Sequence, residues 1–160
     1  MTTPLPPRVI GAMLVGGQFL LLAVIVLIPT GADWPIPRWV LGCGVALCVG
    51  GVVLAIAAAL GLGRSLTPMP IPNERNELRT TGLYRWVRHP IYTGLIAFAI
   101  GRTIISGNVL TLVACITLVA LLFFKSRWEE EHLNRRYPEY EKYARATGRF
   151  VPRVTRSTRH

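Results

Sequence analysis

The chain has 160 residues, of which 51% are hydrophobic and only 16% are charged, yet it carries a formal net charge of +10. Soluble domains carry about 25% charged residues, so this composition is typical of a membrane protein. It excludes intrinsic disorder and argues against a soluble nucleic-acid-binding module, which does not need long uncharged runs. The three cysteines lie inside apolar runs and are odd in number, which excludes a disulfide-stapled secreted domain.

The first two apolar runs are each long enough to cross a membrane, which takes about 20 apolar residues. Residues 9–28 form the first run, with Gln18 as the one strongly polar side chain, and residues 39–62 form the second, without any charge. The alternative for the first run is a signal peptide. We expect a retained helix, because the run is too long for the apolar region of a signal peptide and no convincing small-residue cleavage site follows.

The third apolar run, residues 91–124, is too long for a single crossing. At about 1.5 Å per residue it would measure roughly 50 Å, against a hydrocarbon core of about 30 Å. Its middle contains Arg102 and then Ser-Gly-Asn at 106–108, which are turn residues. The sequence therefore predicts a tight helical hairpin with arms at 91–105 and 109–124.

The distribution of Lys and Arg predicts how these helices are oriented, because cytoplasmic loops carry the excess of positive charge. The loop 63–90 holds five arginines and ten Lys or Arg residues follow from Lys125 onward, whereas the loop 29–38 has no net charge. We expect both termini and the long loop in the cytoplasm. The predicted fold is an all-α integral membrane protein, a single domain over residues 1–160, with four transmembrane helices and a cytoplasmic C-terminal helical segment.

Gly42, Ala46 and Gly50 form a stripe of small residues along the second apolar run. Such stripes let helices approach closely in lipid. We expect this stripe to pack inside the helical bundle, and the alternative is a surface for dimerisation.

Residues suited to binding a ligand gather in two segments, 63–92 and 125–152, both predicted to be cytoplasmic. The first segment ends in Arg-His-Pro-Ile-Tyr. Because proline is favoured at the first position of a helix, His89 is expected at a helix N-terminus, where the dipole favours anionic groups. Tyr84 and Tyr92 can stack on an aromatic ligand. The alternative, which we favour for Tyr84 taken alone, is a belt of interfacial aromatic residues.

Three adjacent carboxylates, Glu129 to Glu131, follow the last apolar run. They would be unfavourable at the end of a membrane helix, so we expect the helix to continue into the cytoplasm. For Glu131 we expect an exposed position paired with Arg135. The functional interpretation is that Glu129 or Glu130 faces Arg88 and His89. The histidines lack the spacing of a metal site and no dinucleotide-binding glycine motif links a strand to a helix, so we expect neither.

These motifs together resemble the isoprenylcysteine carboxyl methyltransferase family, and more broadly the membrane methyltransferases that include phospholipid methyltransferases. The matching pattern is Gly82-Leu-Tyr84-Arg-x-Val-Arg88-His89-Pro90-x-Tyr92-x-Gly94, a short hairpin, Glu129-Glu130-x-x-Leu133 and Tyr137-x-x-Tyr140-x-x-Tyr143. It extends over residues 66–152, more than half of the chain. The family's Phe-Gly-x-x-Tyr is shortened here to Tyr137-Pro-Glu-Tyr140, a departure that concerns the identity of the substrate more than the use of the cofactor.

The resemblance implies that the chain uses S-adenosylmethionine without a Rossmann fold, in a site facing the cytoplasm, on a lipophilic acceptor that enters from the bilayer. The acceptor group is a carboxylate, as in isoprenylcysteine methyl esterification, or another lipid group. By position, the cofactor-binding residues are Asn76, Glu77, Leu78, Arg79, Tyr84, His89, Pro90, Ile91, Tyr92 and Glu129. The catalytic residues are Arg88, Arg127, Glu129 and Glu130, with Arg127 facing the substrate and Lys125 as its rival.

The chemistry of the cofactor agrees with these residue types. A carboxylate such as Glu129 can pair with the cationic end of S-adenosylmethionine, and the helix start at His89, with Arg88 or Arg79, can hold its carboxylate. Two alternatives remain. One is a membrane reductase of the sterol-reductase type, whose NADPH would be held by a basic cluster of Arg75, Arg79, Arg85 and Arg88. The other is a small non-enzymatic scaffold or transport subunit, which charges lining a path through the membrane would favour.

Overall fold

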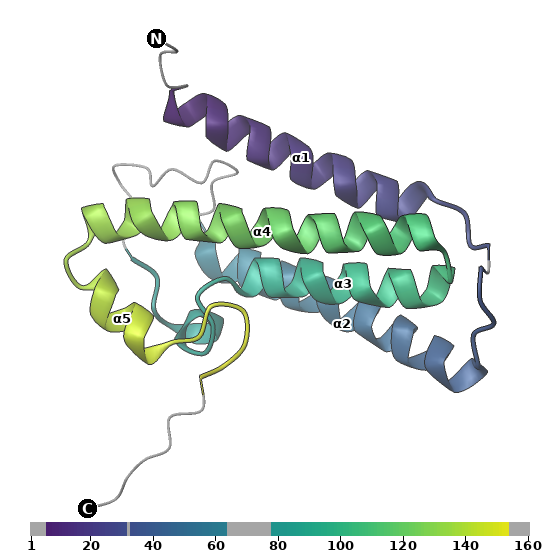
Figure 1. Ribbon diagram of the computed structural model, residues 1–160. Coiled ribbons are helices and arrows are strands. Elements are labelled where there is room, and N and C mark those ends of the chain that lie inside the picture. Colours follow the sequence, from purple (N-terminus) through teal and green to yellow (C-terminus); the bar gives the residue numbers. More distant parts are fainter. Residues whose placement is uncertain (1–5, 32, 64–77, 154–160) are drawn as a thin grey trace, which may run out of the picture.

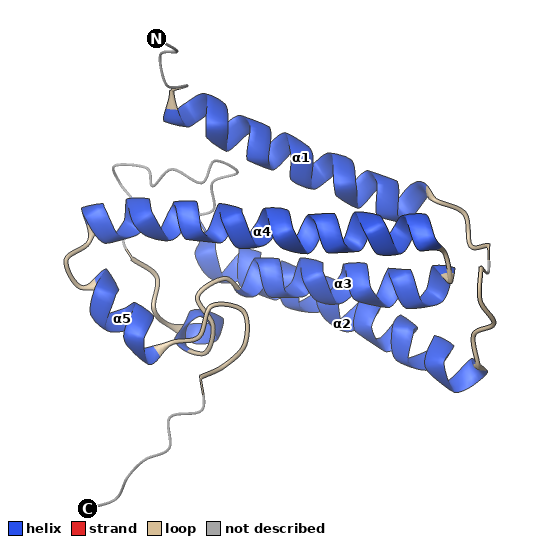
Figure 2. Ribbon diagram, viewed as in Figure 1, coloured by secondary structure: helices blue, strands red, loops and turns tan. Residues whose placement is uncertain are grey.

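The structure is a computed structural model that describes residues 6–31, 33–63 and 78–153. Over these residues the chain is helical (Figure 2), with an isolated parallel bridge between Val87 and Gly148 as its one β interaction. The elements in chain order are α1 Pro7–Leu27, α2 Arg38–Leu62, the 3₁₀ helix η2 Gly82–Arg85, α3 Pro90–Ser106, α4 Val109–Arg136 and α5 Tyr140–Ala146. The predicted all-α class is confirmed.

Three of these helices, α1, α2 and α4, are long and apolar enough to cross a membrane, whereas α3 is apolar but has only 17 residues. The crossing by α3, and with it the count of four, stays a prediction. The helix α4 does not end at residue 124 but continues to Arg136, as expected from its carboxylates. Its 28 residues measure about 42 Å, so the turns beyond about residue 128 lie outside a hydrocarbon core about 30 Å thick.

The hairpin between α3 and α4 forms at the predicted turn. Gly107 has a φ of 56°, the left-handed conformation that glycine adopts without a steric penalty, and it ends α3. Asn108 then begins α4 as its N-cap, and its side-chain oxygen accepts a hydrogen bond from the Leu110 amide at 2.8 Å. At the same end of the bundle, Arg102 donates to the carbonyl of Ile28 at 2.7 Å, just beyond the last turn of α1.

The antiparallel helices α2 and α3 are in backbone contact through two pairs of glycines. A Cβ atom on Gly51 would lie 2.5 Å from the Gly94 carbonyl oxygen, and one on Gly101 would lie 2.5 Å from the Gly44 carbonyl oxygen. The predicted packing of the stripe Gly42, Ala46 and Gly50 is therefore wrong. Those three residues are exposed, and a Cβ on either glycine would have no neighbour within 4 Å. The face of α2 that packs against α3 instead contains Gly44 and Gly51.

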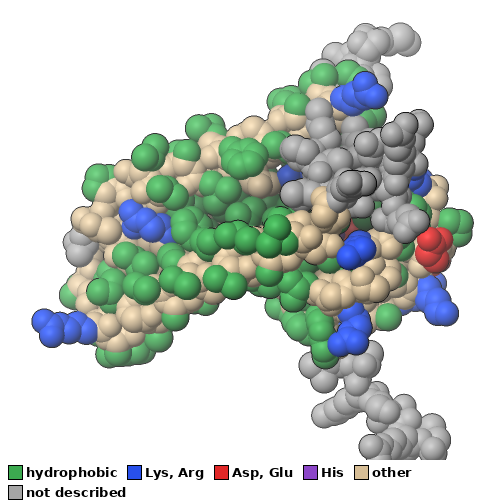
Figure 3. Space-filling view, turned by 180° about the vertical axis from the view of Figure 1, so that it is seen from behind, with side chains coloured by type: hydrophobic (Ala, Val, Ile, Leu, Met, Phe, Trp, Pro, Cys, Tyr) green, Lys and Arg blue, Asp and Glu red, His purple; other side chains and the backbone are tan. Residues whose placement is uncertain are grey.

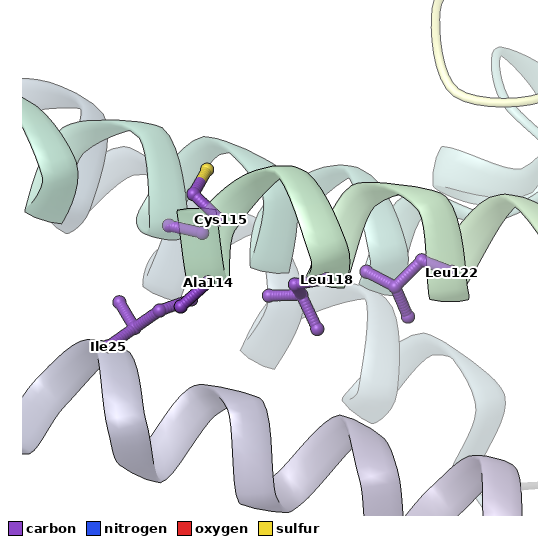
Figure 4. Packing of buried hydrophobic residues seen from close by; sticks show 6 residues of the cluster. Ile25, Ala114, Cys115, Leu118 and Leu122 are labelled. Carbon is purple, nitrogen blue, oxygen red and sulfur yellow. The ribbon is translucent and has the colours of Figure 1, made fainter. Parts of the chain in front are cut away.

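The helix α1 crosses α4 obliquely (Figure 1). Side chains of both helices belong to one hydrophobic core cluster. Ile25 of α1 lies against Ala114 of α4, and the neighbouring Leu118 and Leu122 point toward α1 (Figure 4). The visible face of the bundle is covered mainly by hydrophobic side chains, with charged ones toward its ends (Figure 3). Such a surface fits a lipid environment.

Candidate active site

The site is built where the start of α3, the last turns of α4 and the chain after α5 meet (Figure 1). His89 is the N-cap of α3 and Pro90 is its first residue, as the sequence predicts. Residues 148–150 lie along this helix start, because the amides of Arg88 and His89 donate to the carbonyls of Gly148 (2.8 Å) and Arg149 (3.1 Å). The Thr93 hydroxyl adds a bond to the Phe150 carbonyl at 2.8 Å.

Glu130 on α4 is the centre of a cluster of four charged or titratable side chains. Its carboxylate lies 2.9 Å from the Arg88 Nε, 3.0 Å from the His89 Nε2 and 2.5 Å from an Arg149 guanidinium nitrogen. Arg88 also donates to the carbonyls of Ala144 (2.7 Å) and Thr147. Burial works to raise the pKa of Glu130, but the hydrogen bonds from His89, Arg149 and Arg88 outweigh it and lower the pKa to about 2. Glu130 is therefore ionised, and its negative charge is balanced by the two arginines that pair with it.

Glu129, one residue earlier, has a different environment. It accepts a hydrogen bond from the neutral Tyr92 hydroxyl and lies 3.5 Å from the His89 Nδ1. The rings of His89 and Tyr92 are stacked, with centroids 5.3 Å apart and an angle of 4° between their planes. Burial raises the pKa of the Glu129 carboxyl, and neither arginine that holds Glu130 forms an ion pair with it. Of the two adjacent carboxylates, Glu129 is thus the one that can still pair with a cationic ligand.

Two tyrosines of the predicted motif connect α5 to the loop before α3. The Tyr143 hydroxyl donates to the Tyr84 carbonyl at 2.5 Å, and the Tyr84 hydroxyl reaches the Ala58 carbonyl of α2 at 3.4 Å. Burial is the main cause that raises the pKa of Tyr143 to about 12. Tyr140 is 3% exposed, and its hydroxyl has no hydrogen-bond partner among the described residues. A buried hydroxyl of this kind is a place where a ligand can supply the missing partner.

The other predicted site residues have different environments. Asn76 and Glu77 lie outside the described residues. Leu78 and Ile91 are half-buried, Pro90 is buried and Arg79 is exposed. Arg127 is exposed with its guanidinium 5.6 Å from the Phe123 ring centre, whereas its rival Lys125 is buried inside the bundle.

Glu131 is exposed as predicted, but its predicted ion pair with Arg135 is not formed. The reductase alternative is weakened, because Arg88 of its proposed basic cluster is paired with Glu130. Arg75 of that cluster lies outside the described residues. Sequence reasoning missed Arg149 and Gly148, which reach the site through the fold and carry no local signal.

The described part of the chain is thus a helical membrane protein. Its adjacent carboxylates Glu129 and Glu130 both contact His89, at the start of α3. The family model for phospholipid methyltransferase matches residues 39–140. The chain belongs to this family, and the resemblance inferred from its motifs is confirmed.

Three relatives show the extent of the similarity. The chain is 33% identical to protein-S-isoprenylcysteine O-methyltransferase A of Arabidopsis thaliana, over 72% of this chain and 61% of that protein. It is 34% identical to a probable protein-S-isoprenylcysteine O-methyltransferase of Oryza sativa subsp. indica, over 68% and 59%. It is 29% identical to the nickel-cobalt-cadmium resistance protein NccN of Alcaligenes xylosoxydans xylosoxydans, over 84% and 61%. The matches cover about three fifths of the length of these relatives.

Proposed function

We propose that the protein transfers a methyl group from S-adenosylmethionine to the head group of a lipophilic acceptor held in the bilayer. The observation that carries this proposal is the half-buried Glu129, which accepts a hydrogen bond from Tyr92 and has no ion pair with the arginines that bind Glu130. Family membership supports the reaction type, and the names of the Arabidopsis and rice relatives support a carboxylate acceptor on an isoprenylated group.

The residues present fit S-adenosylmethionine by their chemistry. Glu129 suits the cationic end of the molecule, and the Tyr92 ring beside it offers an aromatic face, which attracts cations. The helix start at His89 and Pro90, with Arg79, suits the cofactor's carboxylate. Tyr84, Leu78 and Ile91 are assigned to the cofactor site by their position in the family motif. Asn76 and Glu77 are assigned from the resemblance alone, since they lie outside the described residues. When bound, the cofactor supplies an electrophilic methyl group, which an acceptor oxygen takes while the sulfur keeps the electron pair of the broken bond.

The cluster around Glu130 has a positioning task in this proposal. Arg88 uses its Nε and Nη1 groups for Glu130 and for two backbone carbonyls, so we assign it to holding α4, α5 and the start of α3 together. That arrangement fixes the His89 ring, which in turn contacts Glu129. Side chains held in this way favour methyl transfer, because the reaction depends mainly on the alignment of donor and acceptor and on the exclusion of water. A carboxylate acceptor needs no general base.

We further propose that the site faces the cytoplasm and that both termini lie on that side. The excess of Lys and Arg in the loop 63–90 and from Lys125 onward supports this orientation. Protease accessibility of a C-terminal tag in sealed vesicles of known sidedness tests it. A tag cleaved only from the opposite face would contradict it.

The reaction itself is tested by incubating the purified chain with methyl-labelled S-adenosylmethionine and a membrane lipid extract. We expect label in an organic-soluble product that releases methanol in alkali, as a methyl ester does. The Glu129→Gln variant, with its fold verified by circular dichroism, serves as the control and should give little product. Absence of label from every lipid fraction would contradict the proposed activity.

A further inference from the structure

Lys125 of α4 and Gln18 of α1 form a buried polar contact in an otherwise apolar interface. The Lys125 Nζ lies 2.7 Å from the Gln18 Oε1, and the two residues are only 3% and 7% exposed. The side chains around them on these helices, such as Leu21 and Leu122, form the hydrophobic core. Packing alone does not require a polar pair here, because apolar residues of similar size would join the helices at least as well.

The position of the ammonium relative to the proposed site is specific. Its Nζ is 5.0 Å from the centre of the Tyr92 ring, and the hydroxyl of the same tyrosine donates to Glu129. Lys125 and Glu129 are four residues apart, so they share one face of α4. They form no ion pair within 4.0 Å in the described structure. A basic and an acidic side chain therefore lie one helical turn apart along the same face.

The ammonium also has unused capacity for an anion. A lysine side chain has three N–H donors. Within the described residues one side chain, Gln18, accepts a hydrogen bond from it. A desolvated cation with donors to spare binds an anionic group more strongly than an exposed cation does.

We propose that Gln18 is a positioning residue that holds the Lys125 ammonium toward the acceptor, and that this pair selects acceptors with a carboxylate head group. The inference rests on the proposed methyl transfer. Glu129 then holds the cationic donor, and Lys125, one turn nearer the apolar part of α4, holds the anionic acceptor that arrives from the lipid. A carboxylate oxygen forms the new bond to the methyl carbon, the sulfur–carbon bond breaks with its electron pair on sulfur, and no proton is transferred.

Gln18 would not be found by comparing family motifs, since the family model matches residues 39–140 and α1 precedes them. Figure 1 shows α1 as the helix that lies outermost on α4, and Gln18 is the residue through which it reaches the site. The helix α1 thereby has a role in choosing the acceptor, beyond anchoring the chain in the membrane.

The full chain in lipid nanodiscs is assayed with N-acetyl-S-farnesylcysteine as the acceptor, for wild type, Gln18→Glu and Gln18→Leu. The Glu variant keeps a partner for Lys125 but neutralises its charge, so a merely structural contact would be preserved. We expect both variants to raise the KM for the acceptor at least about tenfold, while the Kd for S-adenosylmethionine stays within about twofold of wild type. The control Phe19→Leu changes a side chain that is 62% exposed and should alter neither value.

A second measurement does not depend on how the variants fold. By equilibrium binding, the wild type should bind N-acetyl-S-farnesylcysteine, which is a free acid, at least about tenfold more tightly than the corresponding neutral amide. Equal affinity for acid and amide would overturn the proposal, and so would an acceptor KM of wild-type size in both Gln18 variants. A wild type that binds S-adenosylmethionine but methylates no acceptor would instead contradict the proposed function, before any variant is compared.

Discussion

Glu130 on α4 and Arg88 ahead of α3 are 42 residues apart in the sequence, and their carboxylate and guanidinium groups are 2.9 Å apart in the structure. Both side chains are nearly buried, with 12% and 11% exposure. This contact joins the hairpin to the loop that precedes it. The last turns of α4, the start of α3 and the segment after α5 are held together by it.

Glu130→Gln is expected to destabilise the fold strongly. The substitution removes the carboxylate from the nearly buried Arg88 and the half-buried Arg149, and breaking a buried ion pair on one side costs about 3–5 kcal/mol. The free energy of unfolding, measured by denaturant titration in mixed micelles, gives the value. The matched control is Glu131→Gln, the next residue, which is exposed and should change stability by less than about 0.5 kcal/mol. Equal stability of the two variants would show that the cluster does not hold the fold.

The same carboxylate predicts how stability depends on pH. The pKa of Glu130 is lowered to about 2 in the folded protein, against about 4.3 for an unperturbed glutamate. A lowered pKa stabilises the folded state above the unfolded value, and this contribution is lost as the pH falls from about 4.3 toward 2. Thermal unfolding between these pH values should therefore show a steeper loss of stability for wild type than for Glu130→Gln. Parallel curves would contradict the assignment of the shift to Glu130.

The close packing of α2 and α3 predicts opposite outcomes for two adjacent glycines. In Gly51→Ala the new methyl group would meet the Gly94 carbonyl oxygen at 2.5 Å, so the helices must separate, at a cost of about 1–3 kcal/mol. Gly50→Ala has open space, and alanine is the better helix former by about 1 kcal/mol, so this variant should be neutral or slightly more stable. Unfolding of both variants in micelles decides the point. A stable Gly51→Ala would mean that the two backbones are farther apart.

The features that could be predicted from sequence are the ones with a local cause. The hairpin follows from Gly107 and Asn108, whose conformational preferences act within a few residues. The continuation of α4 follows from the cost of carboxylates in lipid. In α2, by contrast, apolar residues surround the whole helix, so periodicity could not decide whether Gly42 and Gly50 or Gly44 and Gly51 face α3.

The candidate site divides in the same way. The pairing of the carboxylates with Arg88 and His89 could be anticipated from residue type and chain order. Which of the two carboxylates is bound by arginines could not be predicted. The answer depends on Arg149, which the fold brings to Glu130 without any local sequence signal. The contact between Gln18 and Lys125 likewise depends on how α1 docks, 107 residues away in the chain.

Binding of S-adenosylmethionine to the detergent-purified chain, measured by isothermal titration calorimetry, tests the central claim most directly. We expect saturable binding by wild type and by Glu131→Gln, and at least about tenfold weaker binding, or about 1.4 kcal/mol, by Glu129→Gln and by His89→Ala. No binding by folded wild type, or wild-type affinity in both the Glu129 and the His89 variants, would contradict the assignment of the cofactor site to Glu129 and His89.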